Sequence, residues 1–210
     1  FEFLNWHELR VKTLKIQRQI FADENKELSK AEYERLLEAV KSQKNERLYY
    51  LMQTICSTGI RISELKFITV EAIKRGIVYA ANKGKSRKVY IPDSLAELLK
   101  TYIAKKNIKK GSIFVTRTGR PLDRSNIWAE MKKLCKKAGV LASKIFPHSL
   151  RHLFARTYYK THQDVIRLAD ILGHSSVNTT RIYTSESGEV HFRRIQMLGL
   201  VFDLFSKNTT

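Results

Sequence analysis

Four side chains between residues 147 and 183 could together hold a phosphodiester and attack it: His148, Arg151, His174 and Tyr183. An arginine guanidinium forms forked hydrogen bonds to phosphate oxygens. Histidine donates or accepts a proton near neutral pH, and a tyrosine hydroxyl can act as a covalent nucleophile. These residue types therefore indicate phosphoryl-transfer chemistry on an anionic substrate.

The same histidines allow a metal-binding alternative. His148 and His152 stand four residues apart, as in the H-E-x-x-H zinc signature, but Ser149 occupies the place of the glutamate and a third ligand is not evident. A buried histidine pair is the more ordinary alternative. Arg151, however, has no acidic residue near it in the sequence, which favours an anionic ligand. We predict no metal site.

The charge balance points in the same direction. The 210 residues include 39 Lys and Arg against 20 Asp and Glu, a formal net charge of +19, whereas the 43% of hydrophobic residues is ordinary for a globular protein. An excess this large without a low-complexity basic tail predicts a polyanion partner, nucleic acid first. A ribosomal or membrane-surface role is the alternative.

Cysteine usage and hydropathy bear on the compartment. Cys56 and Cys135 form neither a disulfide framework nor a C-x-x-C site, which favours a reducing interior. No stretch approaches the roughly 20 apolar residues of a membrane span, and no signal peptide is visible. We predict a cytoplasmic protein with no membrane partner.

The elements that must position the four side chains begin with helices. Ser29 and Glu32 form a capping box, so a helix follows Ser29, and a second helix is predicted from about Glu46 to Thr58, ending at Gly59. Two strands, 77–80 and 87–91, are predicted around a turn at 82–86. Further expected elements are a helix capped by Asp93 to about residue 106, a short strand or extended piece at 113–115, helices at about 124–137, 148–159 and 165–172 (ended by Gly173), a helix from Ser175 or Ser176 that carries Tyr183, and a terminal helix within 191–205.

An ATP site is the alternative at the turn, because Gly84-Lys85-Ser86 imitates the end of a P-loop. The imitation fails, since Tyr79 stands where the P-loop requires a glycine, and a strand follows instead of a helix. We predict no ATP requirement.

Several short motifs carry a resemblance when they are taken in order. They are S-T-G-I-R-I-S-E-L at 57–65, H-x-x-R at 148–151, L-G-H-S-S at 172–176 and a tyrosine nine residues after His174. This series resembles the tyrosine recombinase (phage-integrase) family over residues 28 to 190. The resemblance implies an α+β, mainly α-helical fold with a small antiparallel β-sheet near its N-terminal half.

The resemblance also implies roles for six catalytic residues: Arg61, Lys83, His148, Arg151, His174 and the nucleophile Tyr183. The two arginines would clamp the phosphate, with Glu64 a structural neighbour. His148 would accept the tyrosine proton, His174 would hydrogen-bond a phosphate oxygen, and a 3′-phosphotyrosyl enzyme would form without metal or ATP. Lys83, in a β-turn similar to the family pattern K-G-x-x-x-R, would be the general acid, with Lys85 one turn residue away.

Basic residues outside this set are predicted DNA contacts: Lys85, Arg87, Lys88, Lys132, Lys133 and Lys136. Those between 132 and 137 lie on one basic face of a predicted helix. A solvated run of charge is the alternative interpretation of that face.

The resemblance implies a domain plan and partners. Residues 1–25 would be a linker or arm from an N-terminal core-binding domain that is missing here, 26–188 the catalytic domain, and 189–210 a helix that docks on a neighbouring protomer. The expected partners are double-stranded DNA at specific attachment sites and further copies of the chain, as a tetramer on DNA. We expect a prokaryotic, nucleoid-associated protein.

The predicted function is therefore a site-specific DNA recombinase that integrates or excises a mobile element. The alternatives are a type IB-like topoisomerase, a catalytically silent DNA-binding protein of the same fold, and a basic scaffold protein. Because backbone neutralisation by Lys and Arg gives salt-dependent DNA binding whatever the activity, the charge supports each of them.

Overall fold

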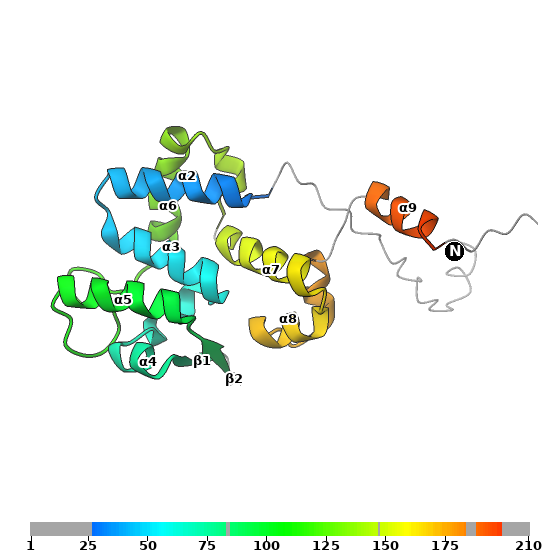
Figure 1. The fold of residues 1–210 in the computed structure, drawn as a ribbon. Helices are drawn as coiled ribbons and strands as arrows, with labels where there is room; N and C mark the ends of the chain where they lie inside the picture. The colour runs from blue at the N-terminus through cyan, green and yellow to red at the C-terminus, as the bar shows by residue number, and fades with distance from the viewer. Residues whose placement is uncertain (1–26, 83–84, 147, 184–187, 199–210) are drawn as a thin grey trace, which may run out of the picture. The chain divides into compact units, whose positions relative to one another are not determined.

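The computed structural model describes residues 27–82, 85–146, 148–183 and 188–198 (Figure 1). Residues 23–185 form one compact unit, and residues 1–22 and 186–210 a second, of which helix α9 is described. The α-helices are α2 (Lys30–Ser42), α3 (Glu46–Thr58), α4 (Val70–Arg75), α5 (Asp93–Lys105), α6 (Arg124–Ala138), α7 (Ser149–His162), α8 (Val165–Leu172) and α9 (Gly188–Gln196). The 3₁₀ helices are η2 (Ile62–Phe67), η3 (Ala142–Lys144), η4 (Val177–Thr179) and η5 (Arg181–Tyr183), and the strands are β1 (Ile77–Asn82) and β2 (Lys85–Tyr90).

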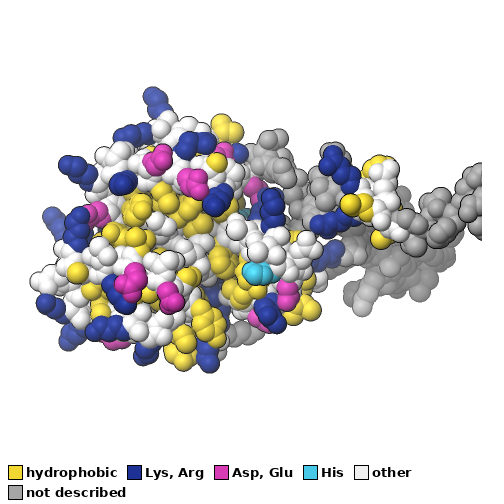
Figure 2. All heavy atoms as spheres, in the orientation of Figure 1, with side chains coloured by type: hydrophobic (Ala, Val, Ile, Leu, Met, Phe, Trp, Pro, Cys, Tyr) yellow, Lys and Arg dark blue, Asp and Glu magenta, His cyan; other side chains and the backbone are white. Residues whose placement is uncertain are grey.

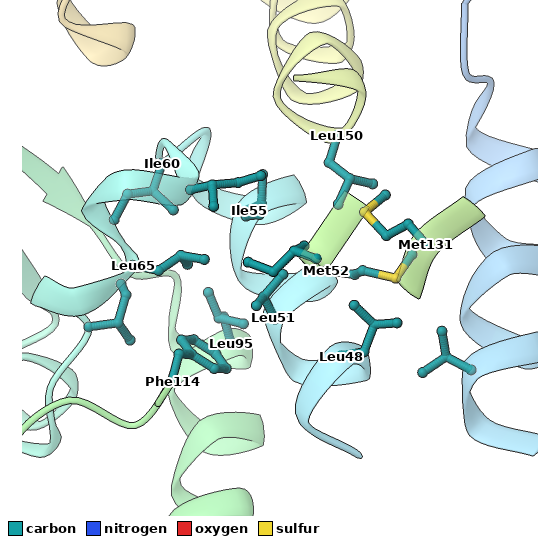
Figure 3. Close-up of a cluster of buried hydrophobic side chains, with 14 of the residues drawn as sticks. Leu48, Leu51, Met52, Ile55, Ile60, Leu65, Leu95, Phe114, Met131 and Leu150 are labelled. Carbon is teal, nitrogen blue, oxygen red and sulfur yellow. The ribbon is translucent and has the colours of Figure 1, made fainter. Parts of the chain in front are cut away.

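Helix α3 is the centre of the core. Its apolar residues recur at intervals of three and four, which gives one continuous apolar stripe. The helix contacts α2, α5 and α7, and Figure 3 shows Leu51 and Met52 pointing into a cluster that also receives Met131 from α6 and Leu150 from α7. Because α7 packs directly on α3, the start of α7 is held close to the end of α3, where the site lies.

Gly59 ends α3 in the left-handed conformation, with a φ of 62°. A Cβ at this position would lie 2.5 Å from Cδ1 of Phe154 on α7. Both the backbone angle and the space therefore require glycine here. The close approach brings the Gly59 carbonyl next to α7.

The two strands pair antiparallel, with Val78 opposite Val89 and Ala80 opposite Arg87. Val78, Ala80 and Val89 are buried, so the face of the hairpin that carries them is turned to the protein interior. Since side chains alternate between the two faces of a strand, Arg87 shares this inward face. The hairpin thus sends an arginine into the molecule.

The predicted fold class, mainly helical with a small antiparallel sheet, is confirmed. The helices predicted from Ser29, at 46–58, at about 124–137 and at 165–172 are present, as are the two strands. Ser29 and Glu32 form the predicted capping box, and Gly173 ends α8 at a φ of 63°. The capping box and the terminal glycine were therefore sufficient to predict where these helices begin and end.

Two local predictions were wrong in detail. The N-cap of α5 is Pro92, so Asp93 is the first helical residue and not the cap. Residues 113–115, predicted as a short strand or an extended piece, form no regular strand, and Val115 makes an isolated bridge to Pro121. Residues 177–183 form two 3₁₀ helices instead of one α-helix.

Two further expectations concern the chain ends. The terminal helix begins at Gly188, earlier than predicted, and ends at Gln196, while residues 199–210 and the linker 1–25 lie outside the described residues. Among the described helices, none has the length and apolar character needed to span a bilayer.

Candidate active site

A buried carboxylate stands at one side of the site. Glu64 of η2 is 1% exposed and binds two guanidinium groups: Arg61 Nη1 donates to Oε1 over 2.9 Å, and Arg87 Nη2 donates to Oε2 over 2.8 Å. The backbone N–H of Arg61 donates to Oε2 as well, over 3.0 Å. Burial alone raises the pKa of Glu64, but the Arg61 N–H and the Arg87 and Arg61 charges outweigh it and hold the pKa below its usual value.

Both arginines also reach the C-terminal end of α8. Arg61 Nη2 donates to the carbonyl of Gly173 over 3.0 Å, and Arg87 Nη1 donates to the carbonyl of Ile171 over 2.6 Å. The last carbonyls of a helix have no partner within the helix and carry partial negative charge. Glu64 and the end of α8 therefore both hold the two guanidinium groups.

Arg151 of α7 is 3% exposed and is held mainly by main-chain carbonyls. Its Nη1 donates to the carbonyl of Gly59 over 2.5 Å, and its Nη2 donates to the carbonyl of Leu172 over 2.7 Å. Burial, with repulsion from Arg61 and Arg87, lowers the pKa of Arg151 to about 10, so the group stays charged at neutral pH. Because carbonyls are neutral, these contacts orient the positive charge without cancelling it.

His174 follows the end of α8 and is bound through both ring nitrogens. Its Nε2 lies 3.1 Å from Arg151 Nη2, and its Nδ1 lies 2.8 Å from Oγ1 of Thr180, a residue with no exposed surface. Burial, together with the charges of Arg151, Arg61 and Arg87, lowers the pKa of His174 to about 4. The imidazole is therefore neutral at pH 7.

Tyr183 ends η5 and lies inside the same group. Its ring stands edge-on to His152, with ring centres 4.8 Å apart, and nearly parallel to His174, at 6.1 Å. The residue is 6% exposed; burial raises the pKa of its hydroxyl, and the charges of Arg151 and Arg61 oppose that rise. A tyrosine hydroxyl thus sits within the field of two arginines.

The two histidines of α7 have different surroundings. His148 is exposed at the N-cap of α7, and partial burial, then the charges of Arg124, Arg151 and Arg61, lowers its pKa. His152 packs edge-on against Phe146 as well as Tyr183, and burial lowers its pKa to about 4. His148 therefore faces outward beside the arginines, while His152 is a packing partner of the tyrosine.

The structure brings together Arg61, Arg151, His174 and Tyr183 and places His148 beside them. Lys83 lies outside the described residues, as do Gly84 and Pro147. Lys85 is paired with Asn82 through the strand backbone, and Lys88 is exposed on β2. In the sequence Lys83 stands between β1 and β2, and Arg87 of β2 contacts the site.

The predicted DNA contacts do not share one environment. Lys132, Lys133 and Lys136 are exposed on α6, and Lys132 Nζ lies 4.2 Å from the ring centre of Trp128. Over the larger unit, Lys and Arg side chains lie around the edge of the face drawn in Figure 2, whose centre is hydrophobic. Arg87 differs from the lysines, because its side chain is 11% exposed and its guanidinium binds groups of the protein itself.

The sequence analysis did not predict the contacts that two residues, Arg87 and Thr180, make within the site. Arg87 could have been found, because strand alternation places it on the same face as the apolar Val89 and Ile91. Thr180 gives no signal of its own beyond standing three residues before Tyr183. Its contact with His174 depends on how the chain turns after α8.

Comparison with known proteins agrees with this arrangement. The chain is 34% identical to a protein named tyrosine recombinase XerD from Oceanobacillus iheyensis over 168 residues, which are 75% of this chain and 56% of that relative. It is 33% identical to tyrosine recombinase XerA from Thermococcus kodakarensis over 204 residues, 93% of this chain and 69% of the relative. This chain thus spans little more than half the length of the XerD relative.

A solved structure supports the fold. The crystal structure of the XerH site-specific recombinase bound to palindromic difH substrate, in a post-cleavage complex, superposes with a TM-score of 0.70 at 26% identity, over 82% of this chain and 52% of that chain. The expected recombinase catalytic-domain fold is therefore confirmed. The model of the phage integrase family matches residues 26–189, and the chain belongs to that family.

Proposed function

We propose that this chain is the catalytic part of a site-specific DNA recombinase that cuts and rejoins strands through a phosphotyrosine. One observation carries the proposal: Arg61, Arg151 and His174, which come from three separate parts of the chain, converge with Tyr183 in a partly buried cluster. The uncancelled charge of Arg151 suits a phosphodiester. XerH, which is similar in fold, is named as a site-specific recombinase bound to palindromic difH substrate in a post-cleavage complex.

In the proposed first step, Oη of Tyr183 attacks the scissile phosphorus, a new P–O bond forms and the bond to the 5′-oxygen breaks. His148, neutral at pH 7, accepts the tyrosine proton. Arg61 and Arg151 stabilise the charge that builds on the phosphate oxygens. The product is a 3′-phosphotyrosyl enzyme and a free 5′-hydroxyl.

Lys83 would supply the proton that the leaving 5′-oxygen needs. The position of Arg87 supports this role, because its contacts with Glu64 and the Ile171 carbonyl attach β2, which begins two residues after Lys83 in the sequence, to the site. Rejoining is the reverse attack by a 5′-hydroxyl on the phosphotyrosine. The reaction needs no ATP, since the phosphotyrosine keeps the energy of the broken bond, and we propose that it needs no metal.

The proposed domain plan assigns residues 26–188 to catalysis and α9 to contact with a neighbouring protomer, within a tetramer on DNA. The described part of the second unit supports the contact, because Phe192, Ile195, Met197 and Leu198 are large apolar residues with at least 60% of their surface exposed. Integration or excision of a mobile element is the proposed biological reaction. The relatives are named only as tyrosine recombinases XerD and XerA, and these names do not distinguish integration or excision of a mobile element from other site-specific recombination.

The decisive experiment is formation of a covalent adduct on nicked duplexes that carry candidate attachment sites. Wild type and Tyr183→Phe are incubated in EDTA, and products are resolved in SDS. We expect an SDS-resistant protein–DNA band in wild type and its loss in Tyr183→Phe. The matched control is Tyr159→Phe, which removes the same hydroxyl from a tyrosine of α7 packed on the same small cluster and should form the adduct normally.

Each other outcome is informative. Equal adduct in Tyr183→Phe would reject Tyr183 as the nucleophile. DNA binding without an adduct, in wild type as in both variants, would favour the catalytically silent DNA-binding protein. If wild type formed the band without EDTA but not in its presence, the metal-independent mechanism would be rejected.

A further inference from the structure

The hydrogen bonds of His174 determine which of its nitrogens carries the proton. An arginine guanidinium can only donate, so Nε2 of His174 accepts the hydrogen bond from Arg151 Nη2. The neutral ring then carries its proton on Nδ1, which donates to Thr180 Oγ1. Arg151 therefore donates to His174, and His174 donates to Thr180.

This order conflicts with the phosphate contact that the family resemblance implies for His174. To hydrogen-bond a phosphate oxygen, Nε2 must donate, whereas in the structure it accepts. When a phosphate oxygen accepts the hydrogen bond of Arg151 Nη2, Nε2 of His174 loses its donor. The unprotonated Nε2 would then face an anionic oxygen, and two acceptors cannot bond to each other. The ring must therefore gain a proton on Nε2 before it can assist.

The partner on the other side of the ring can accommodate the change, because a hydroxyl both donates and accepts. We propose that Thr180 is a positioning residue whose hydroxyl reverses its hydrogen bond, accepting from Nδ1–H before the phosphate binds and donating to Nδ1 afterwards. His174 then loses the proton on Nδ1 and gains one on Nε2 by exchange with water, and its charge does not change. This inference rests on the proposed strand-cleavage function.

The charges around the ring favour this neutral route over an imidazolium. Arg151 faces the ring from α7, Arg61 from the start of η2 and Arg87 from β2, while His152 and Tyr183 complete its surroundings. Glu64 is the acidic group of this cluster, and it binds Arg61 and Arg87 directly. A positive charge on the ring would therefore be repelled by three guanidinium groups.

The first test needs no DNA and reads the tautomer. In protein labelled with ¹⁵N-histidine, NMR at neutral pH should show His174 with a protonated Nδ1 and an unprotonated Nε2. Thr180→Val, which keeps the shape and removes the hydroxyl, should keep this tautomer, because Arg151 still donates to Nε2, but should shift the Nδ1–H resonance that reports the lost hydrogen bond; Thr180→Ser should restore that resonance. Thr179→Val is the matched control, because Thr179 is adjacent but exposed; an unchanged His174 spectrum in folded Thr180→Val would overturn the inference.

The second test reads the reaction on the nicked substrate. Thr180→Val should form the adduct about tenfold more slowly, the effect expected from one lost hydrogen bond, and Thr180→Ser should recover to within about threefold of wild type. Equal rates for Thr180→Val and wild type would overturn the positioning role while leaving the proposed function intact. If wild type itself formed no adduct, the proposed function would fail, but the tautomer measurement would still stand.

A third measurement separates the neutral route from its competitor. In Tyr183→Phe bound to the same duplex, the His174 ring should carry its single proton on Nε2. Protonation of both nitrogens would show that an imidazolium forms and would overturn the proposed reversal at Thr180.

Discussion

Arg87 crosses the backbone of Gly173 so closely that a side chain at Gly173 has no room. A Cβ built there would collide with Cδ of Arg87 and lie 2.9 Å from its Nε. The same arginine binds Glu64 and the carbonyl of Ile171. The glycine before His174 is thus where the hairpin and the end of α8 meet.

Gly173→Ala should therefore destabilise the protein by more than the backbone effect alone. The left-handed conformation costs a non-glycine residue about 1–2 kcal/mol, and displacing Arg87 adds about 1–3 kcal/mol. Gly139→Ala is the matched control, because Gly139 ends α6 at a φ of 60° with open space around its Cβ position. Urea unfolding measures the free energy of unfolding of both variants. An equal decrease in the two would show that the Arg87 side chain moves away from a Cβ at position 173 without an energetic cost.

Glu64→Gln should lower stability at neutral pH by about 3 kcal/mol, because it leaves buried guanidinium groups without a countercharge. The pKa of Glu64 is lowered on folding, so the carboxylate stabilises the protein fully above its unfolded pKa of 4.5 and less as pH falls through the folded pKa. The gap between wild type and Glu64→Gln should thus close below about pH 4.5. Chemical denaturation at several pH values tests this.

The control for Glu64 is Glu97→Gln. Glu97 pairs with Lys100 on the surface of α5, where both side chains are largely exposed. An exposed pair contributes about 0–1 kcal/mol, so this variant should unfold almost as wild type does. A constant gap between wild type and Glu64→Gln down to pH 3 would contradict the charge argument.

Arg87 and Lys88 are neighbours that should behave differently. Lys88→Ala, on the exposed face of the hairpin, should keep stability within about 0.5 kcal/mol and reduce the slope of log Kd against log salt by about 1 if Lys88 contacts a DNA phosphate. Arg87→Met should lower the free energy of unfolding and leave the salt slope unchanged. A reduced slope for Arg87→Met and not for Lys88→Ala would reverse the two assignments.

The acid dependence of cleavage should come from His148. Since its pKa is lowered from 6.5, the rate of adduct formation should rise as pH increases through a value below 6.5 and be level near pH 7. His148→Gln should be slower by about a hundredfold or more and should lack this acid limb. Single-turnover rates from pH 5 to 8 measure both, and an acid limb that persists in His148→Gln would assign the titration to another group.

The helices that position the site could be predicted because their signals are local. The capping residues and the intervals of the apolar residues in α3 and α8 are set by neighbours in the chain, and both helices end at the glycine that the sequence marks. The convergence of Arg61, Arg151, His174 and Tyr183 was expected only through the family resemblance. No local rule joins residues so far apart.

The chain after His174 shows where local rules failed. A cap at Ser176 followed by polar residues suggests an α-helix, but the segment forms two 3₁₀ turns. In a 3₁₀ helix, residues three apart lie on the same side, so Thr180 and Tyr183 can both be buried. Contacts with His174 and α7, which the sequence does not display, decide the conformation.

The carbonyl anchors of Arg151 and Arg61 also have a consequence for folding. These hydrogen bonds join residues 92 and 112 positions apart, and the contact of Arg87 with Ile171 spans 84. Contacts between such distant positions form only after the entropy of closing long loops has been overcome. The cluster around Arg151 therefore forms only in a chain that has completed its topology, and a ribosome-bound or truncated chain that ends before α8 lacks Tyr183, His174 and the carbonyls of α8 that hold the arginines.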